Sequence, residues 1–118
     1  MAATAVTNTS LKFNEAKTLP TAVAVDATDG AAVDFSSRED GRILIILENA
    51  AAAEKAVTVL AGDSIQGVRD LAITLSADEK KVITVESGRY MHVSGDNRGC
   101  VIIKGADANV KVAAIELP

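Results

Sequence analysis

The sequence is poor in aromatic residues, with two Phe, one Tyr and no Trp among 118 residues. Hydrophobic residues still make up 48% of the chain, so the core of this single domain must consist of Val, Ile, Leu and Ala. Small β-branched side chains suit a thin sandwich of β-sheets and leave little for an aromatic-lined ligand pocket. A carbohydrate-binding or adhesin-like sandwich, which would stack sugars on exposed rings, is disfavoured for the same reason.

Reactive side chains are equally scarce, since Cys100 is the only cysteine and His92 the only histidine. The cysteine cannot form an internal disulfide, and the two residues leave a zinc site two ligands short. Cys100 lies in an apolar pattern where a thiol packs as a small hydrophobe, and His92 is expected to face solvent. The sixteen acidic residues leave paired catalytic carboxylates open, but such enzymes usually bind sugars on aromatic platforms. We expect no enzyme activity and no cofactor.

A basic face is also missing. The chain has 12 basic and 16 acidic residues, a net charge of −4 and a pI near 4.9, and its basic residues are scattered. Nucleic-acid binding, which needs a basic surface, is therefore not expected. The chain shows no signal-peptide pattern and no run of the roughly 18 apolar residues that a membrane span requires. These features predict a soluble protein made in the cytoplasm.

What the sequence does contain is a series of short apolar patterns separated by Gly- and Asp-containing turns. Leu71–Leu75 and Ala31–Phe35 alternate, which predicts strands with one buried face. Arg42–Asn49 holds five apolar residues in succession, which predicts a central strand covered on both faces. Further strands are expected over residues 21–25, 56–61, 81–86, 90–93, 100–104 and 110–117. Turns every 8–12 residues or so are typical of an all-β fold, here an antiparallel β-sandwich of jelly-roll or Greek-key type with eight or nine strands.

The N-terminal residues 1–19 differ from the rest because they are small and polar. We interpret them as an arm that docks on a neighbour, with the sandwich spanning residues 20–118. In an extended arm Leu11 and Phe13 face the same side and could dock together on an adjacent surface. The alternative is that Leu11–Glu15 forms the first edge strand of the sandwich.

The segment Ala61–Asp70 carries Gly62 and Gly67, which raises the possibility of a phosphate-binding loop. Such a loop needs a Gly-Lys-Ser/Thr sequence and a following helix, whereas a strand pattern follows here. We expect a packing or binding loop at one end of the sandwich, with Ile65 and Arg69 as candidate partner contacts.

The turn Asp26–Gly30 places two aspartates three residues apart, which lacks the alternate ligand spacing of a calcium loop. Hydrogen bonding within the turn is their expected role, and no metal is expected there.

The order of the segments from Asp40 to Leu117 carries a family resemblance. They are the Asp40–Arg42 lead-in, Glu48–Asn49 at the end of a strand, Val57–Val59, the Gly62–Gly67 loop, Leu71–Leu75, Glu86–Tyr90 and Val112–Leu117. In this ordered series, about two thirds of the chain resembles small β-sandwich structural proteins encoded among the head genes of tailed bacteriophages and prophages.

The resemblance implies a decoration, or cement, protein that binds the outside of an assembled capsid and stabilises it. Its partners would be the major capsid protein and further copies of itself, with a homotrimer favoured. An acidic protein is repelled by packaged DNA, which also favours the capsid exterior. The alternative within phage particles is a head–tail adaptor or tail-associated protein, which would favour a ring of about six or twelve copies.

Overall fold

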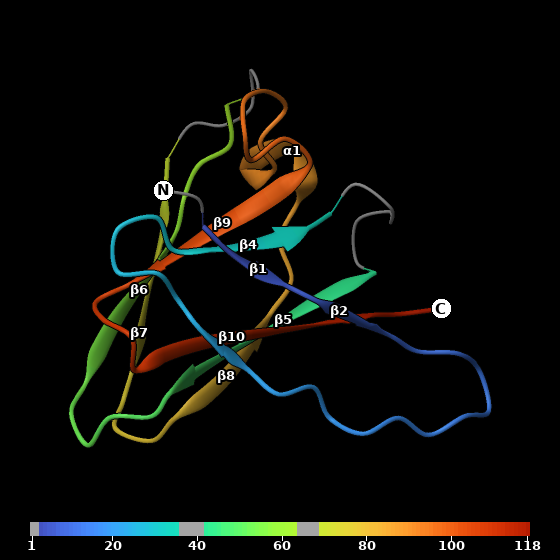
Figure 1. Cartoon of the computed structure of the whole chain (residues 1–118), viewed down its shortest axis with the longest axis horizontal. Coiled ribbons are helices and arrows are strands. Elements are labelled where there is room, and N and C mark those ends of the chain that lie inside the picture. Colours follow the sequence, from blue (N-terminus) through green and yellow to red (C-terminus); the bar gives the residue numbers. More distant parts are fainter. Residues whose placement is uncertain (1–2, 36–41, 64–68) are drawn as a thin grey trace.

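The computed structural model describes residues 3–35, 42–63 and 69–118, which form two β-sheets packed on each other (Figure 1). Sheet A contains, in spatial order, β1 (Thr4–Val6), β4 (Ala31–Asp34), β9 (Cys100–Gly105), β6 (Lys55–Val59) and β7 (Leu71–Leu75). Sheet B contains β2 (Asn8–Ser10), β10 (Val110–Glu116), β5 (Ile43–Asn49) and β8 (Lys80–Ile83), and β3 (Val23–Ala24) also pairs with β10. The all-β sandwich predicted from the sequence is confirmed.

The pairing of the first strands makes both sheets mixed. β1 is parallel to β4 and β2 is parallel to β10, whereas every other strand pair among the described residues is antiparallel. These added strands bring the described total to ten, against the eight or nine expected. The sandwich is therefore antiparallel except where the N-terminal segment joins it.

The expectation of an arm over residues 1–19 needs correction for its first part. Val6 is 7% exposed and belongs to the core, and the chain crosses from sheet A to sheet B at Thr7. The Asn8 amide donates to the Asp34 carbonyl and to the Glu116 carboxylate. The edge strand of the alternative interpretation thus exists, but it lies at residues 4–10 and not at Leu11–Glu15.

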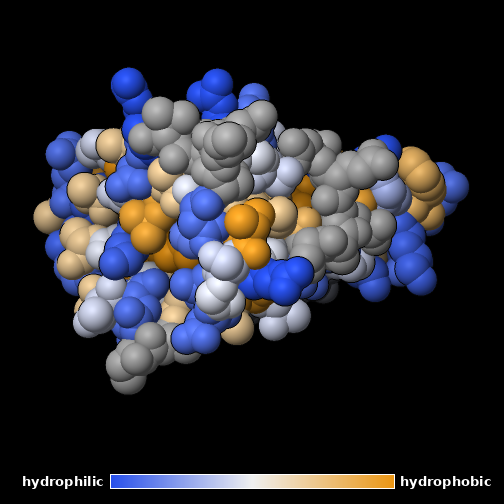
Figure 2. All heavy atoms as spheres, turned by 90° about the horizontal axis from the view of Figure 1, so that it is seen from above, coloured by the Kyte–Doolittle hydropathy of each residue, from blue (hydrophilic) through white to orange (hydrophobic). Residues whose placement is uncertain are grey.

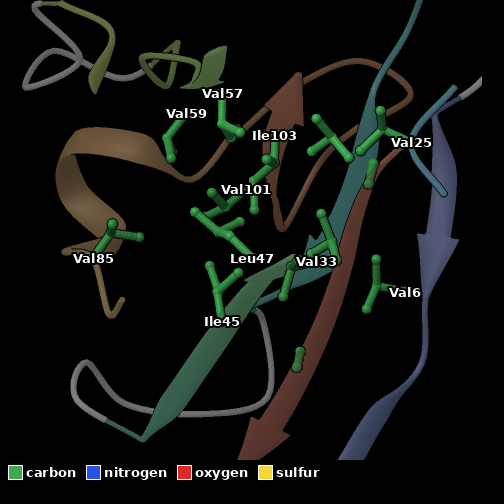
Figure 3. Packing of buried hydrophobic residues seen from close by; sticks show 14 of the residues in the cluster. Val6, Val25, Val33, Ile45, Leu47, Val57, Val59, Val85, Val101 and Ile103 are labelled. Carbon is green, nitrogen blue, oxygen red and sulfur yellow. The ribbon is translucent and has the colours of Figure 1, made fainter. Parts of the chain in front are cut away.

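The core lies between the sheets and is built from aliphatic side chains, as the composition requires. Ile45 and Leu47 point from β5 toward Val101 and Ile103 of β9 (Figure 3). Phe35 is the only aromatic residue among the buried core residues of the described chain. The alternation expected for Leu71–Leu75 and for Ala31–Phe35 is found in their burial.

Two local expectations differ from the structure. The strand expected over residues 90–93 is replaced by the short helix α1 (Ser87–Tyr90) and a single bridge at Met91. The backbone N–H groups of Arg89 and Tyr90 both donate to the Glu86 carbonyl, so the chain turns here before β9. The strand expected to be covered on both faces is β5, which is central in sheet B but alternates between buried and half-buried residues.

Candidate functional site

The connection between β2 and β3 carries the two most exposed large hydrophobic side chains among the described residues. Every residue from Lys12 to Leu19 is exposed, and the side chains of Phe13 and Leu19 are 78% and 76% exposed. We call residues 11–22 the Phe13 loop. It projects at the lower right of Figure 1, and Figure 2 shows apolar atoms at the same pointed end of the molecule, with hydrophilic atoms around them.

Both ends of the Phe13 loop are fixed to the same strand. The Leu11 N–H donates to the Glu116 carbonyl at 2.8 Å, which prolongs the pairing of β2 with β10, and β3 pairs with β10 at Lys111 and Val112. Leu11 is half-buried, whereas the chain turns at Phe13 and at Asn14, whose φ is 61°. The two residues therefore do not share one extended face, and Phe13 alone is presented to solvent.

The other candidate contacts lie elsewhere. Arg69 is exposed and precedes β7, an edge strand of sheet A, whereas the Phe13 loop is attached to β10 of sheet B (Figure 1). Ile65 lies outside the described residues. The structure therefore does not bring Arg69 together with Leu11 and Phe13.

The described parts of the Ala61–Asp70 segment are held by hydrogen bonds within the segment and to α1. The Ala61 N–H donates to Asp70 Oδ1 at 2.7 Å, and the Gly62 N–H donates to the Arg89 carbonyl at 2.8 Å. A Cβ added at Gly62 would lie 2.5 Å from the Met91 carbonyl oxygen, so this close approach requires glycine. The strand β7 follows the segment, as expected, so the element after it offers no helix N-terminus to a phosphate.

Asp63 connects this segment to the chain that follows α1. Its carboxylate accepts hydrogen bonds from the Val93 N–H at 2.6 Å and from the Ser94 hydroxyl at 2.7 Å. These bonds, that of Val93 foremost, hold the pKa of Asp63 below its ordinary value. The carboxylate is thus used to fasten two loops to each other.

His92 contacts Cys100 at its backbone carbonyl oxygen, which also lies 3.4 Å from the ring nitrogen Nδ1 of His92. The His92 N–H donates to the Cys100 carbonyl at 2.9 Å, and the Gly99 N–H donates to the His92 carbonyl at 2.7 Å. Burial, and secondarily the charge of Asp34, raises the pKa of the Cys100 thiol, which disfavours the nucleophilic thiolate. The contacts that join His92 to Cys100 thus use the carbonyl of Cys100 and not its thiol.

Two hollows have His92 in their lining. An open depression of about 480 Å³ is lined by Met91, His92, Val93, Arg98 and Gly99. A smaller hollow of about 180 Å³ includes Asp29, His92, Asp96, Asn97 and Lys104 in its lining. Over the described ranges, no three His, Cys, Asp or Glu residues converge as metal ligands, and no helix is long and apolar enough to cross a membrane.

The outer face of sheet B is an apolar surface that the sequence reasoning missed. Leu44 and Ile46 on β5 pair with Ile115 and Ala113 on β10, and Ile46 also pairs with Val82 on β8. The successive apolar residues of Arg42–Asn49 are the sequence signal for this surface, but on their own they predict a strand whose two faces are both covered by other parts of the chain. In the structure Leu44, Ile46 and Ile115 on the second face are half-buried, Ala113 is buried, and Val82 remains 60% exposed.

Comparison of the chain with protein-family models, with curated proteins and with solved structures finds no match.

Proposed function

We propose that this chain is a decoration protein, which binds the outer surface of an assembled phage capsid and stabilises it. The observation that carries the proposal is the Phe13 loop, which presents two bulky apolar side chains on a segment fixed at both ends. The ordered series of motifs from Asp40 to Leu117 supports the same class of protein.

The Phe13 loop suits attachment to a large surface for an energetic reason. A loop whose two ends are already ordered loses less conformational entropy on binding than a free arm does. Aromatic side chains contribute strongly to protein–protein interfaces when they enter an apolar pocket of the partner. Phe13 and Leu19 would supply such contacts to the major capsid protein, and Lys12, Glu15 and Lys17 would form the polar rim.

The charge of the chain fits the exterior of the capsid. A net charge of −4 gives no attraction to packaged DNA, and a sandwich held by an aliphatic core can stabilise a lattice without chemistry of its own. Binding only to the assembled lattice would stabilise that lattice through mass action.

Co-sedimentation with capsids tests the proposal. Capsids assembled without this chain, from the phage or prophage that encodes it, are mixed with the purified protein and pelleted. We expect the wild-type protein to pellet with the capsids and to raise their dissociation temperature. The substitution Phe13→Ala should weaken this binding by about thirtyfold or more, since truncation of an interface anchor costs about 2 kcal/mol or more.

Val93→Ala is the matched control, because Val93 is also an exposed apolar residue but lies in the connection between α1 and β9, two elements that are far from the Phe13 loop (Figure 1). It should pellet as the wild type does, and both variants should keep the wild-type melting temperature. A wild-type protein that never pellets with capsids would contradict the proposed function. Equal binding by Phe13→Ala would exclude the Phe13 loop as the contact.

A further inference from the structure

The outer face of sheet B carries two aliphatic rows bordered by a charged row. One aliphatic row is formed by Ile115 and Leu44, and the other by Ala113, Ile46 and Val82. The charged row is formed by Lys111, Glu48 and Lys80, whose signs alternate from β10 across β5 to β8. These residues lie two apart along each strand and therefore share one face of the sheet.

This face is separate from the core of the domain. The buried core cluster and the half-buried hydrophobic residues packed against it include none of Leu44, Ile46, Val82 or Ile115. A contiguous apolar patch on a sheet face marks an interaction surface more often than a scattered exposed residue does. Leu44, Ile46 and Ile115 are half-buried and Val82 is exposed, so these four side chains are available to a partner, whereas Ala113 is 3% exposed and is not.

The two edges of sheet B are less suited to a partner than its outer face. β8, one edge of sheet B, carries Lys80 and Lys81, and charged residues on an edge oppose strand addition. The ammonium group of Lys81 also donates to the Thr74 carbonyl on β7, the neighbouring edge of sheet A, at 2.9 Å. At the opposite side of sheet B, β2 and β3 already cover β10. A contact between copies would thus use the face.

We propose that a second copy of this chain packs on the outer face of sheet B, related by a two-fold axis that runs along the strands between β5 and β10. This axis places β5 of each copy over β10 of the other. Glu48 then faces the partner's Lys111, and Leu44 faces the partner's Ile115, so opposite charges meet and aliphatic side chains meet. The face is self-complementary in charge, as a two-fold contact requires.

The size of this contact sets its strength. The longest strands, β5 and β10, have seven residues each, and the sheet is four strands wide. The face therefore measures at most about 24 by 19 Å, and a contact between two copies would bury at most about 900 Å² in total. Stable interfaces usually bury about 1,200–2,000 Å², so the contact in free solution is weak and depends on concentration. Copies bound side by side on a lattice would have a high effective concentration, but the contact does not require capsid binding.

Sedimentation equilibrium and light scattering across a concentration series test the inference on the purified full chain. We expect the mass to rise from 12.2 kDa toward that of a dimer. Glu48→Lys and Lys111→Glu each place like charges opposite each other across the axis. Each should raise the dimer dissociation constant by about tenfold, which corresponds to about 1.4 kcal/mol. The double variant, which exchanges the two charges, should recover most of the lost affinity; Glu48 also pairs with Lys80 of its own chain at 3.7 Å, and the exchange removes that pair.

Glu54→Lys is the control for the change in net charge, because Glu54 is exposed in the β5–β6 connection, outside this face. It should leave the dissociation constant unchanged, and melting curves confirm that each variant is folded. A wild-type monomer at every concentration, a trimer, or a double variant that stays dissociated would overturn the inference. A monomer whose Glu48→Lys variant loses capsid binding would instead assign this face to the capsid, independently of the Phe13 loop.

Discussion

At the scale of single residues, the carboxylates of Asp26 and Asp63 hold turns and loops of the chain in place. Asp26 accepts hydrogen bonds from the Thr28 and Asp29 N–H groups, as the Asp26–Gly30 pattern predicts, and Gly30 has the positive φ of 78° expected there. The role of Asp63 could not be predicted in this way. Its partner Val93 lies 30 residues away, and only the packing of the two loops brings them together.

Acid should weaken the link that Asp63 makes. Because hydrogen bonds lower its pKa in the folded chain, the stabilisation is present above the ordinary value of 3.8 and is lost as the pH falls through the lower folded value. We therefore expect Asp63→Ala to lower the melting temperature at neutral pH and the difference from wild type to narrow below about pH 4.

Amide hydrogen exchange at Val93 gives a local measurement of the same link, since this N–H is the donor. Its exchange should accelerate in Asp63→Ala and remain as in wild type in Glu54→Ala, whose side chain is exposed. A difference in melting temperature that persists unchanged into acid would show that Asp63 acts through something other than its charge.

Asn49 is a second residue whose role follows from tertiary contacts. Its side chain is 1% exposed, donates to the carbonyls of Ala53, Leu75 and Ser76, and accepts from the Ala51 N–H. Asn49→Ala leaves these groups without their partner, so we expect a loss of about 2–4 kcal/mol in the free energy of unfolding. Urea unfolding measures this loss, and Asn109→Ala, at an exposed asparagine, should change the free energy by less than about 0.5 kcal/mol.

At the scale of elements, the alternation of apolar and polar residues was sufficient to predict a strand where one of its faces is buried and the other is exposed. It gave Leu71–Leu75 and Ala31–Phe35 correctly, because side chains on successive residues of a strand point to opposite faces. It misjudged β5, because an apolar residue on the outer face looks the same in sequence whether it is covered by the same chain or left for a partner.

The first two strands could not be predicted from their own residues. Asn8–Ser10 is wholly polar and Thr4–Val6 contains a single bulky apolar residue, so neither shows a strand pattern. They are strands because the edges of β4 and β10 offer backbone partners, which is a tertiary effect. The exposed Phe13, by contrast, was identified in sequence as a candidate contact, although its supposed pairing with Leu11 was not found.

At the scale of the whole molecule, the N-terminal segment links the two sheets. β1 completes one edge of sheet A and β2 covers part of an edge of sheet B, with only Thr7 between them. The same segment also holds the start of the Phe13 loop against β10. The stability of the sandwich and the position of the loop therefore both depend on residues 4–10.

Removal of residues 1–10 should consequently destabilise the entire fold, rather than detach an independent arm. The deletion takes Val6 from the core, frees the edges of β4 and β10, and removes the Asn8 hydrogen bonds to Asp34 and Glu116. We expect the melting temperature, measured by circular dichroism, to fall by at least about 10 °C. Val6→Ala should cost about 1–3 kcal/mol by itself, because it removes buried methyl groups, whereas Phe13→Ala removes an exposed ring and should leave the melting temperature unchanged. A deletion variant that melts as the wild type does would mean that β1 and β2 contribute nothing to the sandwich, and that residues 1–19 act as an arm after all.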